Sequence, residues 1–408
     1  MTRRVVVTGI GLVTSIGSEV DSFWSALLAG RSGIRPVGSF DTKDYNVHIG
    51  GEVVDFSPEG VVSRLDLRQV GRAAQFAIVA ACRALADAGI DWRRLDPARA
   101  GVSMGTTSGE PREVETFTDA YLAGDLGKIG SELALRYPCG SIPGSVAAAL
   151  GFAGPNTMIP TACAAGNYAA ANAMECLRDG SADLMLAGGS DSFSRITYTG
   201  FARLGAIAPE RCQPFDLNRK GMVPGEGAAV LVLEPADHAL RRGARVYAEL
   251  VGYGLSCDAH HMTASHPEGD GAVRAMQAAL ADAGLRPADV SYVSAHGTGT
   301  PTNDRIETLA VKRVFGDAAS RIPVSSAKSM LGHTMGAASA IETAICALAI
   351  HSGRIPPTIN YETPDPACDL DCVPNQAREC RVEVAMNNAY AFGGNNASLI
   401  LRRYQGAK

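Results

Sequence analysis

The chain has 408 residues, which is enough for two domains or for one large duplicated body with proper hydrophobic cores. Hydrophobic residues make up 46% and charged residues 19%, a balance typical of a globular protein in water. The formal net charge of −5 offers no basic surface for nucleic acid, so nucleic acid is not an expected partner. No apolar run approaches the roughly 20 residues that span a bilayer. We therefore expect no membrane insertion and a cytoplasmic location.

The N-terminus superficially resembles a secretory signal, because Arg3-Arg4 precede an apolar stretch. Glycines at positions 9, 11 and 17 interrupt that stretch, and no convincing small-residue cleavage site follows. A first buried strand that begins with Val5-Val6-Val7 is the better interpretation.

Ten cysteines are scattered along the chain, a pattern that favours reduced thiols over a disulfide framework. The only cluster is Cys368, Cys372 and Cys380. This cluster has no C-x-x-C pair and no nearby histidine, so we expect no zinc site there.

The sequence contains an internal duplication. Residues 84–90 read ALADAGI and residues 279–285 read ALADAGL, and each ends a helix-like run, Arg72–Ala88 and Gly271–Ala283. In each copy a glycine stands where a helix C-cap is expected. A strand with a glycine turn follows, and then a small-residue turn that leads into an Ala-rich helix, Thr161–Leu177 in one copy and Gly332–Ile350 in the other.

Short apolar runs that suit strands alternate with these helices, at 184–187, 230–233 and 324–326. This alternation indicates an α/β layered fold. The boundary between the copies should lie near Pro235–Glu249, which gives an N-terminal half of residues 1–245 and a C-terminal half of residues 246–408. No Pro- or Ser-rich linker separates them, so we expect one packed body.

Cys163 is the first candidate for chemistry. It lies among small residues in Pro160–Gly166, directly before the Ala-rich helix. The N-terminus of a helix favours the thiolate, which is the nucleophilic form of cysteine. The alternative is a buried structural cysteine.

Two histidines occupy related positions in the second half. His296 ends a strand and enters the turn Gly297–Thr300, and His333 follows Lys328 by five residues, just before the second Ala-rich helix. The alternatives are a phosphate-binding loop for the first, although its P-loop lysine is missing, and a core histidine for the second. If the halves pack by pseudo-symmetry, the turns that carry Cys163, His296 and His333 converge on one site.

These motifs, in this order, resemble those of the β-ketoacyl-[acyl-carrier-protein] synthases, most closely the synthase II type. The resemblance spans nearly the whole chain and includes the segments Arg4–Gly9, Gly221–Glu234, Val246–Thr263, Pro356–Asn360 and Asn387–Asn396. It implies a thiolase-like duplicated fold, a five-layer αβαβα body, which usually forms a dimer. The duplication read from the residues agrees with that fold.

The resemblance also implies an activity, an acyltransferase that condenses acyl chains by a decarboxylative Claisen reaction. Cys163 matches the nucleophile that accepts an acyl group from acyl-carrier protein. His296 and His333 match the pair that assists decarboxylation of malonyl-carrier protein, and neutral histidines donating through Nε2 could stabilise the enolate. The backbone N–H groups of Cys163 and Phe392 match the oxyanion hole, with Phe392 gating the site.

Lys328 matches the family's active-site lysine, and we expect Glu307 to be its carboxylate partner, because a buried lysine usually needs a counter-charge. Thr298, Thr300, Gly393 and Gly394 match supporting positions of the site. The chemistry needs no metal or separate cofactor, because the substrates are carried on the phosphopantetheine of acyl-carrier protein.

The chain departs from the family pattern at several positions. Ala391 and Asn395 replace a usual Gly and Thr beside Phe392, and the extra bulk of Ala391 is expected to stiffen the loop that gates acyl entry. In the segment that resembles the carrier-protein contact, Leu65 and Gln69 replace common lysines. We expect carrier docking through the arginines that remain, Arg64, Arg68 and Arg72; the alternative is an exposed helix face.

Within the family, the main alternative to a homodimeric fatty-acid enzyme is the ketosynthase subunit of a type II polyketide or polyene pathway, in a heterodimer with a chain-length factor. A catalytically silent partner subunit is a remote alternative, because such subunits lose the nucleophilic cysteine. A cysteine hydrolase is disfavoured, because no Cys-His-Asn signature is present.

Overall fold

The central sheet of the protein has an order of strands that is symmetric about its middle. The computed structural model describes residues 3–58 and 60–406. Within them, ten strands pair in the order β10-β9-β13-β14-β8-β1-β7-β6-β4-β5. Their bounds are β1 Val5–Val13, β4 Ala100–Gly105, β5 Asn156–Ile159, β6 Leu184–Asp191, β7 Gly227–Pro235, β8 Ala248–Cys257, β9 Tyr292–Ser294, β10 Val324–Ser325, β13 Val384–Tyr390 and β14 Asn395–Arg402. Two short ladders accompany this sheet, β2 Arg35–Pro36 with β3 Ile49–Gly50 and β11 Arg354–Ile355 with β12 Arg378–Glu379.

The two halves of the sheet are related by a pseudo-twofold axis. The order β5-β4-β6-β7-β1 in one half corresponds to β10-β9-β13-β14-β8 in the other. In each half three neighbouring strands are parallel: β4 runs parallel to β5 and β6, and β9 runs parallel to β10 and β13. The next strand in each half, β7 or β14, pairs antiparallel with both of its neighbours. The halves join where β1 pairs antiparallel with β8, from Val5 opposite Leu250 to Val7 opposite Ala248. This arrangement confirms the duplication predicted from the repeated sequence.

Helices cover both faces of each half-sheet. Their bounds are α1 Val20–Leu28, α2 Arg72–Asp87, α3 Pro111–Leu122, α4 Leu133–Arg136, α5 Ser141–Leu150, α6 Ala165–Arg178, α7 Arg195–Arg203, α8 Ala236–Arg241, α9 Asp270–Ala283, α10 Pro301–Phe315, α11 Lys328–Leu331 and α12 Ala338–Ser352. Helices α2 and α5 pack on the N-terminal half-sheet and α9 packs on the C-terminal one, with α10 against α9. Helices α6 and α12 pack against each other between the half-sheets, which gives the predicted αβαβα layers.

The sequence of each layer explains its place. Residues Ala338–Ile350 of α12 are all buried, as expected for a helix that is apolar on every side and lies between two sheets. One segment, Met335–Ser352, is long and apolar enough to cross a membrane, yet 89% of it is buried inside the protein, so it is a core helix. The glycines predicted to end α2 and α9 adopt left-handed φ angles, +66° at Gly89 and +62° at Gly284.

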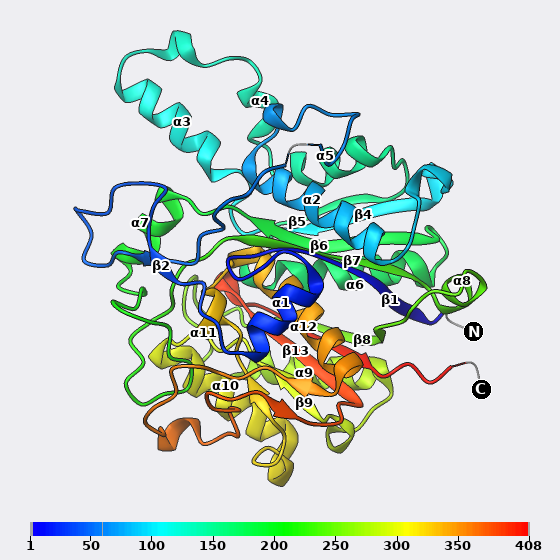
Figure 1. Cartoon of the computed structure of the whole chain (residues 1–408). Coiled ribbons are helices and arrows are strands. Elements are labelled where there is room, and N and C mark those ends of the chain that lie inside the picture. Colours follow the sequence, from blue (N-terminus) through cyan, green and yellow to red (C-terminus); the bar gives the residue numbers. More distant parts are fainter. Residues whose placement is uncertain (1–2, 59, 407–408) are drawn as a thin grey trace.

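Helices α3 and α4 extend away from the body of the molecule, and both termini lie on the same side of it (Figure 1). Segment 111–137 of this extension carries several large apolar side chains that are exposed: Phe117, Tyr121, Leu122, Leu126, Leu135 and Tyr137. The expected boundary at residues 245 and 246 falls between α8 and β8. Division of the chain at that residue stays a prediction.

Candidate active site

Cys163 lies in a tight turn between β5 and α6. The turn is a short 3-10 segment, Ala162–Ala164, and Ala162 adopts a φ of +52°, which is unfavourable for a residue with a Cβ. The sulfur is nearly buried, with the residue 7% exposed. The sequence positions the cysteine there because small residues on both sides let the turn close against the sheet.

Burial controls the protonation of this sulfur. Desolvation raises the pKa of the Cys163 thiol to about 12, and the charge of Lys328 acts in the opposite direction. A helix N-terminus stabilises an anion by up to about 2 kcal/mol, which acts against the effect of burial. Burial therefore acts against the resting thiolate that the helix N-terminus favours, and the thiolate at Cys163 stays a prediction.

His296 and His333 lie side by side. Their ring centroids are 5.5 Å apart, with the planes nearly perpendicular. His296 follows β9, and its backbone N–H and that of Gly297 donate to Glu307, each at 2.8 Å. Burial and the charge of Lys328 lower the pKa of both histidines well below the ordinary value, so both rings are neutral.

The tautomer of His333 is fixed by the backbone that follows it. The N–H of Met335 donates to Nδ1 of His333 at 3.2 Å. A neutral imidazole that accepts at Nδ1 carries its proton on Nε2, so His333 is a hydrogen-bond donor through Nε2. Nδ1 of His296 is buried and has no hydrogen-bond partner among the described residues.

One cavity of about 190 Å³ brings the predicted residues together. It is lined by Cys163, His296 and His333, and also by Thr298, Thr300 and Phe392. Phe392 is 40% exposed, and its ring lies 5.7 Å from that of Phe201, which lines the same cavity. The convergence that the sequence predicted from pseudo-symmetry is confirmed.

The expected ion pair between Lys328 and Glu307 is wrong. Lys328, 2% exposed, forms an ion pair with Glu342 of α12. Glu307 instead holds the turn of His296 through the two backbone N–H groups described above. Glu342 is the one acidic residue of α12, a helix that is mostly apolar, and that single acidic residue was the signal that could have identified it as the counter-charge.

The turn after β13 is held by backbone contacts. Gly393 and Gly394 have φ angles of +83° and +76°, which glycine adopts without strain. The N–H of Gly393 donates to the carbonyl of Met262 at 2.7 Å, and the N–H of Ala391 donates to the carbonyl of Asn395 at 2.9 Å. The first contact ties the backbone next to Phe392 to the segment after β8, and the second closes the turn itself.

A buried polar network connects the elements that carry the site. Asn387 of β13 donates through Nδ2 to Oδ1 of Asn167 at 2.9 Å, to Oγ1 of Thr343 at 2.9 Å and to the carbonyl of Ser339 at 2.8 Å. All four residues are at most 1% exposed. The network therefore joins α6, which follows Cys163, to α12, which follows His333, and to the strand that leads to Phe392.

The three arginines predicted to dock the carrier protein have different environments. Arg64 and Arg68 are exposed, and Arg68 pairs with Asp66 at 2.9 Å with 85% of its own side chain exposed. Arg72 is only 22% exposed and makes hydrogen bonds of 2.9 and 2.7 Å to the buried carboxylate of Glu226. Arg72 is therefore part of the internal packing and is removed from the predicted docking surface.

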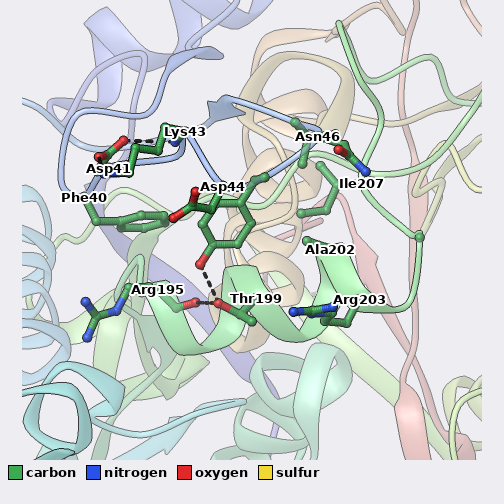
Figure 2. Close-up of a pocket in the computed structure, with 13 residues that line it drawn as sticks. Phe40, Asp41, Lys43, Asp44, Asn46, Arg195, Thr199, Ala202, Arg203 and Ile207 are labelled. Carbon is green, nitrogen blue, oxygen red and sulfur yellow. Dashed lines mark hydrogen bonds and ion pairs between the residues drawn. The ribbon is translucent and has the colours of Figure 1, made fainter. Parts of the chain in front are cut away.

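A larger cavity, of about 670 Å³, lies between α7 and the loop that carries residues 40–46 (Figure 2). Ala202, Arg203 and Ile207 line it, whereas Phe201 and Ala206 line the catalytic cavity. The outer cavity is bounded by a loop that includes Asp41, Lys43 and Asp44, so charges of both signs surround it. Its lining residues include neither histidine nor cysteine.

Sequence reasoning missed Asp191, a buried carboxylate at the end of β6. It also missed the left-handed backbone of Met335, whose φ is +54°. Nothing in the local sequence marks either residue, because their significance depends on contacts between the two halves.

Comparison with known proteins identifies the family. The beta-ketoacyl synthase N-terminal domain matches residues 2–239, and the beta-ketoacyl synthase C-terminal domain matches residues 247–362. The chain belongs to the beta-ketoacyl synthase family. Among curated relatives of this ketosynthase, 3-oxoacyl-[acyl-carrier-protein] synthase 2 of Synechocystis sp. is 40% identical over 99% of both chains. The enzyme of the same name from Coxiella burnetii is 41% identical over 98% of this chain and 99% of that one.

Solved structures similar to this ketosynthase include one with a chain length factor and one of a type II PKS acyl-carrier protein with its ketosynthase. The ishigamide ketosynthase/chain length factor has a TM-score of 0.96 at 44% identity, covering 99% of this chain and 100% of that one. AntDE:AntF, a type II acyl-carrier protein in complex with its ketosynthase bound to the hexaketide, has a TM-score of 0.92 at 36% identity, with the same coverage. These matches confirm the thiolase-like fold and the resemblance predicted from the motifs.

Proposed function

We propose that this ketosynthase loads an acyl chain from acyl-carrier protein onto Cys163 and extends it with malonyl-carrier protein. The product is a β-ketoacyl-carrier protein, one two-carbon unit longer. The observation that carries the proposal is the single cavity shared by one buried thiol and two neutral histidines, in a chain of this family.

In the first step the Cys163 sulfur attacks the carbonyl carbon of the acyl thioester. Burial favours the thiol form of the resting sulfur, so its proton leaves as the new carbon–sulfur bond forms. A neutral imidazole in the same cavity can accept that proton, and the departing carrier thiolate can receive it when its own bond to the acyl carbon breaks. Backbone N–H groups of Cys163 and Phe392 would stabilise the negative oxygen that forms.

In the second step the malonyl group loses carbon dioxide. The bond between its carboxylate carbon and its α-carbon breaks, and the electron pair remains as the enolate of the thioester. The Nε2–H of His333 can donate to the enolate oxygen because Nδ1 of His333 already accepts a backbone N–H. The enolate carbon then attacks the Cys163 thioester and the new carbon–carbon bond forms. The sulfur leaves as a thiolate and takes up one proton from solvent, because its own proton left with the carrier thiol in the first step.

Lys328 and Glu342 support this chemistry electrostatically. The charge of Lys328 opposes the burial effect on Cys163 and helps to keep both histidines neutral. The reaction draws on carrier-bound thioesters alone and uses no separate metal or redox cofactor, and we place it in the cytoplasm. Thr298 and Thr300, whose hydroxyls lie 2.9 Å apart at the cavity, would contact the amides of the phosphopantetheine arm.

The decisive experiment is intact-mass analysis of the purified chain after incubation with acyl-carrier protein. We expect a mass gain of one acyl group in the wild type and in Cys82→Ala, and none in Cys163→Ala. Cys82 is a matched control because its thiol is also nearly buried and burial raises its pKa to about 11, but it lies on α2 in a different part of the core. An unmodified wild type, or a modified Cys163→Ala, would contradict the proposal.

A specific observation favours a second candidate, the ketosynthase subunit of a heterodimer. The ishigamide ketosynthase/chain length factor, at 44%, is more similar to this chain than the two curated relatives above. The exposed apolar side chains of segment 111–137 and the edge strand β5 offer a surface for a second subunit. Gel filtration of the chain expressed alone separates the alternatives: a stable, active homodimer supports fatty-acid synthesis, and insolubility that co-expression with a chain-length factor corrects supports the heterodimer.

A further inference from the structure

Asp191 is a buried carboxylate that no cation neutralises. It is 1% exposed, and none of the ion pairs among the described residues involves it. Buried carboxylates are usually paired with Lys or Arg, because an isolated charge is costly to remove from water. Burial raises the pKa of Asp191 to about 6, and hydrogen bonds act in the opposite direction, so the group is ionised at neutral pH.

Four hydrogen bonds from two separate loops replace the missing cation. Oδ1 accepts from Oγ1 of Thr106 at 2.8 Å and from the N–H of Ser108 at 3.0 Å. Oδ2 accepts from the N–H of Thr107 at 2.7 Å and from the N–H of Gly336 at 2.7 Å. The first three donors belong to the N-terminal half of the chain and the fourth belongs to the C-terminal half, three residues after His333.

The Gly336 contact acts on the backbone that fixes the tautomer of His333. Met335, the residue before Gly336, has a φ of +54° and donates its N–H to Nδ1 of His333. A left-handed φ is costly for a methionine and persists only where surrounding contacts hold it. The hydrogen bond from Gly336 to Asp191 holds the next peptide unit in place, so that the Met335 N–H continues to face the imidazole.

Steric contact makes this arrangement specific to glycine at position 336. A Cβ there would lie 2.5 Å from the carbonyl carbon of Thr106 and from the nitrogen of Thr107. The two loops therefore meet backbone to backbone, with the Asp191 carboxylate as the acceptor between them. Separation of the loops by even a methyl group would break the contact to Gly336.

From this geometry we propose that Asp191 is a positioning residue, which holds the Met335–Gly336 backbone so that His333 keeps its proton on Nε2. The inference rests on the proposed function only for its catalytic consequence; the tautomer itself is a property of the resting protein. Without Asp191 the Met335 backbone can relax, Nδ1 of His333 loses its donor, and the proton distributes over both ring nitrogens. The fraction of enzyme able to donate to the malonyl enolate then falls.

The test combines a spectrum with a rate. Full-length protein labelled with ¹⁵N-histidine reports the tautomer of each neutral ring through long-range ¹H–¹⁵N correlations, and His333→Gln assigns the signals of His333. We expect a pure Nε2–H form in the wild type and a mixture of both tautomers in Asp191→Asn, whose amide N–H₂ would face backbone N–H groups. Decarboxylation of malonyl-carrier protein should fall about tenfold in Asp191→Asn, which is less than the roughly 100-fold loss of a complete oxyanion donor.

The matched control is Glu110→Gln. Glu110 is also 1% exposed and accepts two backbone N–H groups, from Ala73 at 3.1 Å and Ala74 at 2.7 Å, but these cap α2. Glu110→Gln should keep the wild-type tautomer and rate, and Asp191→Glu, which retains both acceptor oxygens, should recover most of the Nε2–H form. If Asp191→Asn yields no folded protein, Gly336→Ala is used instead, because it breaks the hydrogen bond from Gly336 to Asp191 without changing any charge. The ¹H–¹⁵N spectrum of Gly336→Ala then shows whether His333 keeps its proton on Nε2.

Two results would overturn the inference. The first is a pure Nε2–H tautomer at His333 in folded Asp191→Asn or, if that variant does not fold, in Gly336→Ala. The second is a mixture of tautomers in Glu110→Gln to the same extent as in Asp191→Asn. Failure of the proposed function is recognised separately, because the wild type would then show the Nε2–H tautomer without decarboxylating malonyl-carrier protein.

Discussion

Replacement of Arg72 by methionine should destabilise the fold and leave carrier docking intact. The change removes two hydrogen bonds to Glu226 and one of 3.0 Å to the carbonyl of Val53. Loss of one partner from a buried ion pair costs about 3–5 kcal/mol. Arg72 retains 22% exposure, and Glu226 keeps backbone donors from Val53 and Phe193, so we expect the lower end, about 3 kcal/mol.

The assay is the free energy of unfolding from urea titrations, with Arg68→Met as the control. The side chain of Arg68 is 85% exposed, and we expect its loss to change stability by less than about 0.5 kcal/mol. In kinetics at low salt, Arg68→Glu should raise the KM for carrier protein, and Arg72→Met should not. Equal stability of the two methionine variants, together with a salt-dependent rise of KM in Arg72→Met, would refute the assignment of Arg72 to the interior.

Three further predictions concern the site and the core. Glu307→Gln should lower kcat for condensation about tenfold with little change in KM, because an amide side chain cannot accept hydrogen bonds from both the His296 and the Gly297 N–H. Steady-state rates measure the loss, and circular dichroism checks that the variant is folded. Burial raises the pKa of Glu110 from 4.5 to about 7, so the stability that its protonated form contributes is lost as pH rises from about 4.5 through about 7. In urea titrations over this pH range, the difference in unfolding free energy between wild type and Glu110→Gln should change by about 3 kcal/mol. A difference that stays constant with pH would contradict this prediction. Phe392→Ala should let water reach the acyl-enzyme, so that the mass adduct on Cys163 decays several-fold faster than in wild type, whereas Phe117→Ala, on the exposed face of α3, should leave the decay unchanged.

The parts of the site that the sequence predicts are those set by local pattern. Cys163, His296 and His333 each stand at a turn between regular elements, and the repeated ALADAG segments show that these turns come from two equivalent halves. Equivalence of the halves is enough to predict convergence, because a pseudo-twofold axis places like turns together. The equivalence of the two halves can be read from the spacing of the repeated segments along the chain.

The parts that the sequence does not predict depend on which surfaces meet. Glu307 lies close to His296 in sequence and was expected to pair with Lys328. Because α12 packs in the middle layer, Glu342 of that helix forms the ion pair with Lys328 instead. Arg72 begins a helix, where arginine is usually exposed, but that helix end faces Glu226, a single carboxylate in an apolar stretch. Ion-pair partners of this kind are set by tertiary packing, which the local sequence pattern does not predict.

The hydrogen-bonded set of Asn167, Ser339, Thr343 and Asn387 limits how this enzyme can be redesigned. The amides and hydroxyls of the set are buried, so a substitution at one position leaves polar groups at the others without their hydrogen-bond partners. Libraries that vary these positions singly should be dominated by poorly expressed proteins, and productive variants should appear only when the four are exchanged together for an apolar set of similar volume. Engineering of this enzyme for new products therefore has to vary α6, α12 and β13 together, because the four residues link these three elements.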